Sequence, residues 1–110
     1  MVRQVGCVEQ GAWMRWIAIF TNIKDSDVLR EKHLQAHLEY FDRMAGTITL
    51  AGSTTPPGQS FSNGGVGIIK GVSYEEARRI CEEDPFYLAG LREKIEIFAF
   101  TVAPRFDELV

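Results

Sequence analysis

Two residues of the chain have the types that acid–base chemistry needs: His37, in the stretch HLQAHLEYF (33–41), and Asp84, in the stretch EDPFYLAGL (83–91). An imidazole gains or loses charge near neutral pH, and a carboxylate bonded to one ring nitrogen fixes which nitrogen carries the proton. The other nitrogen is then free to move a proton to or from a bound molecule. The pair therefore suits proton transfer, provided that the fold brings the two positions together.

Asp84 and His37 also have purely structural interpretations. Asp84 precedes Pro85, which disfavours a helical conformation for the aspartate and suits the first position of a new turn. Because aspartate is a favoured N-cap, it predicts a capped turn that ends at Gly90. His37 lies roughly 60° from the centre of an apolar helical stripe, a position that an ordinary boundary histidine also occupies. Spacing alone leaves both interpretations open.

The sequence gives less support to a metal site, a serine nucleophile or a phosphate-binding loop. His33 and His37 have the spacing of a two-histidine metal clip, but zinc needs three or four protein ligands and the chain has 2 histidines. No serine stands in a G-x-S-x-G stretch, and the glycines of residues 64–67 precede no predicted helix, so they form no phosphate-binding motif. We therefore expect neither a metal nor a cofactor.

The composition indicates one globular domain over residues 1–110, with 45% hydrophobic and 25% charged residues. A net charge of −3 argues against nucleic-acid binding through phosphates. The longest apolar run, residues 16–20, is far shorter than the ~20 residues of a membrane-spanning helix, and the residues before it do not form a signal peptide. Cys7 and Cys81 make no disulfide framework, which favours a cytoplasmic protein.

The apolar pattern predicts the elements that must position His37 and Asp84. Four runs rich in β-branched and aromatic residues indicate strands: 15–22, 47–53, 66–72 and 94–102. One helix is predicted from the capping residues at 25–27 to Gly46, and a second from Ser73, which forms a capping box with Glu76. The order β-α-β-β-α-β predicts an α+β, ferredoxin-like fold, in which both helices cover one face of a four-stranded antiparallel sheet.

The predicted first strand is apolar at successive positions rather than alternate ones: Trp16, Ile17, Ala18, Ile19 and Phe20. Both faces of the sheet are therefore apolar, although helices cover only one of them. We predict a homodimer with the open faces of the two sheets together, and a higher oligomer made by pairing dimers stays open. The alternative is a monomer in which residues 1–14 cover the open face.

Taken together, these residues resemble the YciI-like (YCII-related) family. The resemblance covers about residues 15–104, and its most specific part is EDPF followed by AGL. The matching pieces are AHLEYFDR at 36–43, AG at 51–52, GGVGII at 64–69, SYEEARRICEEDPFYLAGL at 73–91 and IEIFAF at 95–100. It implies a ferredoxin-like fold paired into a dimeric α+β barrel.

The resemblance also implies a site made by a histidine of the first helix and the aspartate of the D-P-F segment, here His37 and Asp84. The implied chemistry is proton transfer on a small organic substrate without metal or cofactor, as in a lyase, an isomerase or a dehydrochlorinase. Ser53, Tyr40 and Phe86 are the candidate substrate-binding residues.

The chain departs from the family at one position near the histidine. Members commonly carry an arginine three residues before it, where this chain has Leu34. Because Arg30 stands three residues before His33, a shifted register with His33 in the site stays open. The residues after His37, at 38–41, continue the family pattern and favour His37.

Two other functions fit the same sequence. One is a dimeric module that binds a small molecule or joins an assembly without catalysis, in which the histidine and the aspartate only tie two elements together. The other is a cofactor-independent oxygenase, which needs a substrate that itself activates oxygen.

Overall fold

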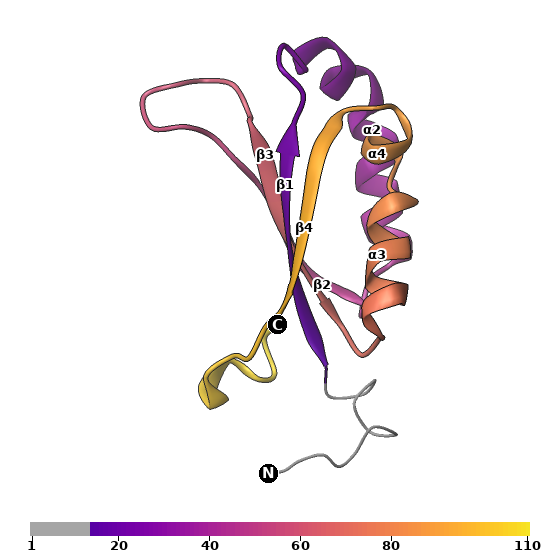
Figure 1. The fold of residues 1–110 in the computed structure, drawn as a ribbon, viewed down its shortest axis with the longest axis vertical. Helices are drawn as coiled ribbons and strands as arrows, with labels where there is room; N and C mark the ends of the chain where they lie inside the picture. The colour runs from indigo at the N-terminus through magenta and orange to yellow at the C-terminus, as the bar shows by residue number, and fades with distance from the viewer. Residues whose placement is uncertain (1–13) are drawn as a thin grey trace.

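A four-stranded antiparallel sheet with helices packed on one face makes up the fold (Figure 1). This computed structural model describes residues 14–110. The strands are β1 (Arg15–Asn22), β2 (Ile48–Thr54), β3 (Gly64–Lys70) and β4 (Arg92–Ala99). The helices are α2 (Asp27–Arg43), α3 (Tyr74–Glu82), the one-turn α4 (Pro85–Leu88) and the 3-10 turn η2 (Pro104–Phe106). The strand order β2-β3-β1-β4 confirms the predicted ferredoxin-like arrangement.

The predicted elements all exist, with shifted ends at β3 and β4. Ser73 caps α3 as predicted, its hydroxyl accepting from the Glu76 N–H at 3.1 Å. β3 begins at Gly64, two residues before the prediction, because its glycines pair closely with both neighbouring strands. A Cβ added to Gly65 would lie 2.6 Å from the Gly52 carbonyl oxygen, so only glycine allows this approach.

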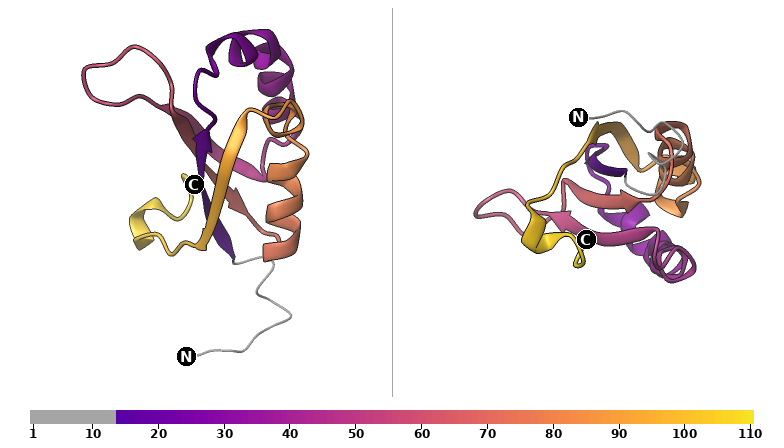
Figure 2. Two further views of the ribbon diagram at one scale, coloured as in Figure 1. Left: turned by 45° about the horizontal axis from the view of Figure 1, so that its top comes forward. Right: turned by 90° about the horizontal axis from the view of Figure 1, so that it is seen from below.

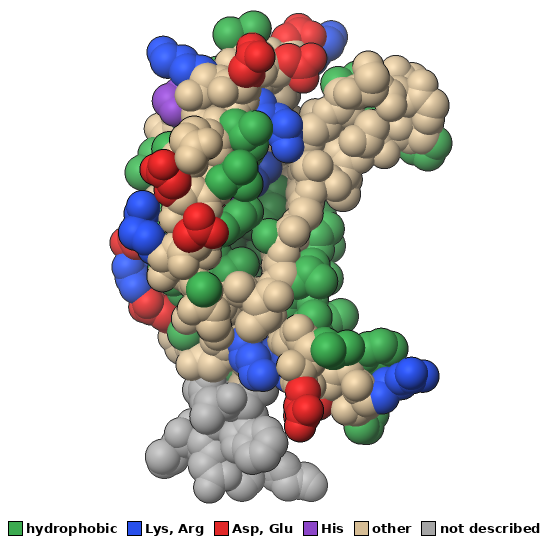
Figure 3. Space-filling model, turned by 180° about the vertical axis from the view of Figure 1, so that it is seen from behind, with side chains coloured by type: hydrophobic (Ala, Val, Ile, Leu, Met, Phe, Trp, Pro, Cys, Tyr) green, Lys and Arg blue, Asp and Glu red, His purple; other side chains and the backbone are tan. Residues whose placement is uncertain are grey.

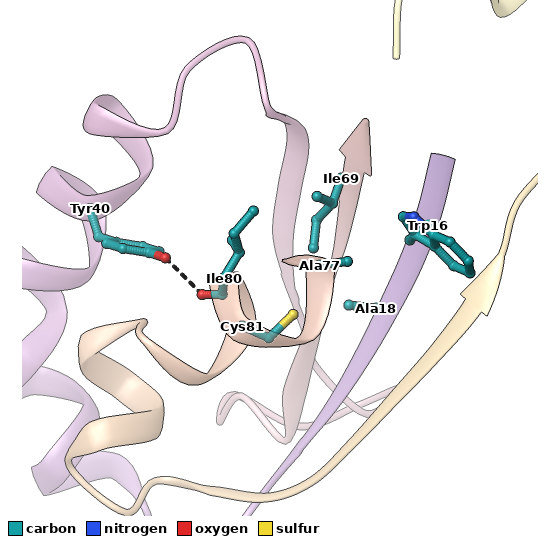
Figure 4. Close-up of a cluster of buried hydrophobic side chains, with 7 residues drawn as sticks. All are labelled: Trp16, Ala18, Tyr40, Ile69, Ala77, Ile80 and Cys81. Atoms are coloured by element: carbon teal, nitrogen blue, oxygen red, sulfur yellow. Dashed lines mark hydrogen bonds between the residues drawn. The ribbon is translucent and has the colours of Figure 1, made fainter. Parts of the chain in front are cut away.

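The core lies between α3 and the helix-covered face of the sheet (Figure 4). Its buried members come from four elements: Trp16, Ala18, Tyr40, Ile69, Ala77, Ile80 and Cys81. The two polar groups within it are paired, since Trp16 Nε1 donates to the Val72 carbonyl at 2.9 Å and the Tyr40 hydroxyl donates to the Ile80 carbonyl at 2.7 Å. Buried apolar side chains therefore fill this end of the layer, called the closed end below.

The opposite face of the sheet carries apolar side chains that no helix of residues 14–110 covers. The strand register places Ile17 between Ile68 and Phe98 on that face. Phe98 is 51% exposed and Leu50 is 46% exposed. Figure 3 shows these green side chains along a concave side of the molecule, between the protruding 55–63 loop and the C-terminal segment. The sheet is thus apolar on both faces, as the sequence predicted.

The C-terminal segment, which the sequence left unassigned, returns to the open side of the sheet (Figure 2). The Arg15 guanidinium donates from Nε to the Val110 carbonyl oxygen at 2.8 Å and forms an ion pair with Asp107 at 3.0 Å. The Thr49 hydroxyl donates to the same carbonyl at 3.0 Å. The alternative in which residues 1–14 cover the open face concerns residues that lie almost wholly outside the described range.

Within residues 14–110, no helix is long and apolar enough to cross a membrane.

Candidate active site

The helix α2 turns His37 inward. Only His37 and Tyr40 of this 17-residue helix are buried, and they lie on the face toward the sheet and α4. His37 is 7% exposed. Its ring lies parallel to the Phe86 ring with centroids 3.7 Å apart, and it forms an edge-to-face pair with the Phe41 ring, with centroids 4.3 Å apart. These aromatic contacts fix the plane of the imidazole.

The turn before α4 places Asp84. Its backbone is extended, with φ −62° and ψ 132°, as expected for a residue before proline. The carboxylate atom Oδ1 accepts from the Phe86 N–H at 3.0 Å and caps α4. The same Oδ1 lies 2.7 Å from His37 Nδ1. The structural and functional interpretations of Asp84 are therefore compatible, because the cap itself aims the carboxylate at the helix.

The His37–Asp84 contact determines the tautomer of the ring. An ionised carboxylate only accepts hydrogen bonds, so Nδ1 carries the proton and donates it. No described residue forms a hydrogen bond with Nε2, which keeps its lone pair in the neutral ring. At 4% exposure, Asp84 is shielded from water, which strengthens its interaction with the ring.

A cavity of about 240 Å³ opens beside this pair, between α2, α4 and the ends of the strands. Its walls come from both layers: Phe20, Arg30, Leu34, His37, Leu38, Phe41, Ala51, Gly52, Ser53, Gly64, Gly65, Val66, Phe86 and Arg92. The cavity thus brings together three of the residues singled out from the sequence, namely His37, Ser53 and Phe86, and Asp84 lies directly behind His37.

Tyr40 and His33 do not line this cavity. Tyr40 points to the core instead, where its hydroxyl is already bonded to Ile80. Burial raises the pKa of Tyr40 to about 12, so the phenol stays neutral. His33 is half-buried on α2, away from the cavity lining. This placement favours the register with His37 and gives Tyr40 a structural role.

Sequence reasoning missed two arginines that line the cavity. Arg30 lies seven residues before His37, which is two turns of helix and the same face, so helical spacing could have found it. Arg92 opens β4 and donates from Nη1 to Asn22 Oδ1 at 2.8 Å. Its Nη2 lies 4.0 Å from Asp84 Oδ2, and its guanidinium lies 4.4 Å from the centroid of the Phe20 ring. No local pattern points to Arg92.

Burial lowers the pKa of Arg92, because the charged guanidinium loses water, while the nearby Asp84 carboxylate opposes this shift. Arg30 adds to the lowering through like-charge repulsion. Arginine remains charged even so.

No group of three or more His, Cys, Asp or Glu residues within residues 14–110 could hold a metal ion. Cys81 is buried in the core, and burial raises the pKa of its thiol to about 12. Cys7 lies outside the described residues.

Comparison with known proteins agrees with the sequence-based resemblance. The chain matches the model of a family described as the YCII-related domain over residues 14–101. No curated protein matches it.

Among solved structures, the chain is similar to 5-chloro-2-hydroxyhydroquinone dehydrochlorinase (TftG) from Burkholderia phenoliruptrix AC1100, solved in complex with 2,5-dihydroxybenzoquinone. The TM-score is 0.76 at 23% identity, over 84% of this chain and 98% of that chain. This similarity confirms the predicted fold, a ferredoxin-like α+β domain with a four-stranded antiparallel sheet.

Two other solved structures are more distant. A protein from Arabidopsis thaliana has a TM-score of 0.46 at 7% identity, over 82% of this chain and 95% of that chain. An ethyl tert-butyl ether d (ethd) family protein from Bacillus halodurans C-125 has a TM-score of 0.44 at 15% identity, over 80% of this chain and 98% of that chain.

Proposed function

The chain belongs to the YCII-related family, and on that premise we propose that it is a small enzyme that moves a proton on an organic substrate. One observation carries the proposal: the His37 ring borders a cavity while its Nδ1 lies 2.7 Å from the buried Asp84 carboxylate. His37 Nε2 takes the proton as general base and returns it as general acid. Asp84 orients the ring and stabilises the imidazolium that forms.

The reaction class is a lyase, an isomerase or a dehydrochlorinase. In a dehydrochlorination the base removes one proton, the electron pair left behind forms a new double bond, and chloride leaves with the electrons of the carbon–chlorine bond. Such a step needs a correctly held base and no electron acceptor. The fold shared with TftG, a 5-chloro-2-hydroxyhydroquinone dehydrochlorinase, makes this the first chemistry to test.

Ser53 and Phe86 contribute to the binding of the substrate. Both line the cavity, Ser53 from β2 and Phe86 from α4. The Ser53 hydroxyl can donate to or accept from a substrate oxygen, and the Phe86 ring forms part of an apolar wall. We assign no substrate contact to the Tyr40 hydroxyl, because it already donates its hydrogen bond to the Ile80 carbonyl.

The working form is a homodimer in which the open faces of two sheets meet. The exposed apolar side chains of that face, Phe98 and Leu50 among them, support this arrangement. A stable interface of this kind buries on the order of 1,600 Å² in total. Sedimentation analysis of the wild type and of Phe98→Lys tests it: a wild-type monomer would contradict the dimer.

The test of the enzyme is chloride release from 5-chloro-2-hydroxyhydroquinone, and from related chlorinated hydroquinones, by the wild type, His37→Asn and His33→Asn. We expect His37→Asn to lower the rate about 10²- to 10⁴-fold, the usual range for general acid–base catalysis. His33→Asn is the matched control, since it changes the same residue type one helical turn away and outside the cavity. Turnover that survives in His37→Asn contradicts the proposal.

A second candidate function is a binding module without catalysis. It is favoured by the double use of Asp84 Oδ1, which accepts from Phe86 and contacts His37 and so ties α4 to α2. In that case Asp84 variants lower the melting temperature while ligand binding persists and no substrate is turned over.

A further inference from the structure

We propose that the cavity takes a single-ring organic anion whose charged oxygen is bound by Arg92 and Arg30; this substrate class rests on the proposed function of the His37–Asp84 pair. Arg92 supplies the inner contact and Arg30 the contact at the mouth. The sequence does not single out Arg92, and it places Arg30 near a site only in the alternative register with His33.

The first observation is an unsatisfied donor on Arg92. Its side chain is only 6% exposed, yet Nε has no hydrogen-bond partner among the described residues. Nη1 is used by Asn22, and Nη2 lies at the limit of an ion pair with Asp84. A buried donor without an acceptor costs free energy, so such groups in native proteins generally have a partner. Because Arg92 lines the cavity, a bound acceptor can supply it.

The second observation is the charge of the cavity. Arg30 lines both this cavity and the adjoining surface hollow, which places it at the mouth. It forms no ion pair within residues 14–110, although Asp27 and Glu31 border the same hollow. The residues that line the cavity include two arginines and no Asp or Glu, and of the two arginines Arg92 alone forms an ion pair, at 4.0 Å from Asp84. A bound anion removes the repulsion between the two guanidinium groups.

The third observation is the shape and size of the cavity. Its volume of about 240 Å³ is below that of pockets for drug-sized molecules, so it suits a molecule of one ring. The rings of Phe20, Phe41 and Phe86 line it. A guanidinium presents a planar row of donors that matches a carboxylate, an enolate or a phenolate oxygen. Placed beside His37, the same donors stabilise negative charge that grows on the substrate oxygen as the proton leaves.

The test compares two probes of the same shape, benzoate and its neutral counterpart benzamide. Each is titrated into the full-length protein while backbone amide NMR shifts are recorded. We expect benzoate to shift residues of the cavity at millimolar concentration and benzamide to bind at least about tenfold more weakly, as the loss of a charge-assisted contact implies.

Three variants assign the preference for the anion. Arg30→Gln and Arg92→Gln should each weaken benzoate binding about tenfold or more and leave benzamide binding unchanged. Arg43→Gln is the matched control, because Arg43 is exposed on the same helix as Arg30 and does not line the cavity. Since Arg92 is buried and its variant can fail to fold, Arg30→Gln alone is enough to decide the outcome.

Equal binding of the two probes, the absence of benzoate binding in the wild type, or an unchanged benzoate affinity in Arg30→Gln overturns the anion site. Because these measurements need no turnover, they can fail while His37→Asn still abolishes the reaction. The reverse result, an anion preference with turnover independent of His37, sinks the proposed function and leaves the anion site standing.

Discussion

The two ends of the helix-covered face of the sheet are built differently. Under α3 the layer is filled by apolar side chains, and its polar groups are paired within the protein. Under α4 and the middle of α2, the same layer holds a cavity and three buried ionisable side chains, those of His37, Asp84 and Arg92. The apolar packing of the first end stabilises the fold, whereas the second end leaves buried hydrogen-bonding groups beside a cavity.

The border between these ends falls within one turn of α2. His37 and Tyr40 are the two buried residues of that helix. The Tyr40 hydroxyl is committed to the Ile80 carbonyl, whereas His37 has one nitrogen fixed by Asp84 and the other unbonded within the described residues. Burial of a polar side chain therefore does not distinguish the two ends; the donors and acceptors that remain unbonded within the described residues do.

The largest expected effect on stability belongs to the closed end. Ile80 is 2% exposed, so Ile80→Ala removes packing and leaves a cavity, which costs about 2–5 kcal/mol of unfolding free energy. Urea unfolding measures this loss. Below the unfolding transition, benzoate binding should stay at the wild-type level. A change in benzoate affinity would show that the two ends are not independent.

Asp84 has two roles at the cavity end, the cap of α4 and the contact with His37, and two variants separate them. Asp84→Asn keeps an oxygen that can cap α4 but removes the charge that stabilises the imidazolium, whereas Asp84→Ala loses both. We expect Asp84→Ala to be less stable than Asp84→Asn by about 1 kcal/mol in urea unfolding. Turnover should fall in both variants. Full turnover in Asp84→Asn would remove the carboxylate from the mechanism.

Tyr40→Phe tests whether Tyr40 belongs to the closed end of the layer and not to the cavity. It deletes the hydroxyl that donates to Ile80 and leaves that buried carbonyl without this partner, at a cost of about 1–2 kcal/mol. Because Tyr40 does not line the cavity, turnover should stay unchanged. Chemical denaturation and the chloride assay measure the two effects. A large loss of turnover without loss of stability would return Tyr40 to the site.

A pH dependence is also expected at the closed end. The folded-state pKa of Tyr40 is raised to about 12 from 10.0, so its contribution to stability is complete below pH 10 and is lost as the pH rises toward 12. Cys81 acts in the same direction from 9.0 to about 12. Stability measured between pH 9 and 12 should therefore fall less steeply in Tyr40→Phe than in the wild type. Parallel slopes would contradict the burial of this phenol.

Much of the fold follows from local patterns. The apolar runs and the Ser73 capping box place the helices and strands, and the proline after Asp84 gives that residue its extended backbone. The same local rule places the Asp84 carboxylate as a cap. Its contact with His37, 47 residues away, depends on how α4 packs on α2, and only the family resemblance indicated it beforehand.

The position of Arg92 in the cavity could not be predicted from local sequence patterns. Arg92 enters the cavity because β1 and β4 change register between Thr21 and Asn22, which brings it opposite Asn22. The sequence predicted that β4 begins at residue 94 and so left Arg92 in a loop. Local spacing also leaves open whether the inward side chain of Tyr40 meets the core or the cavity, because this depends on where α3 lies.

The orientation of His37 by Asp84 is tested most directly by the tautomer of the His37 ring, read from the ring nitrogen resonances of the ¹⁵N-labelled protein. We predict a proton on Nδ1 and a free lone pair on Nε2 in the neutral wild-type ring, and a mixture of tautomers in Asp84→Ala. His33 serves as the internal reference, because it does not contact Asp84. A wild-type His37 with its proton on Nε2, or a tautomer that is indifferent to Asp84→Ala, would contradict the orienting role of the aspartate and remove the base from the proposed reaction.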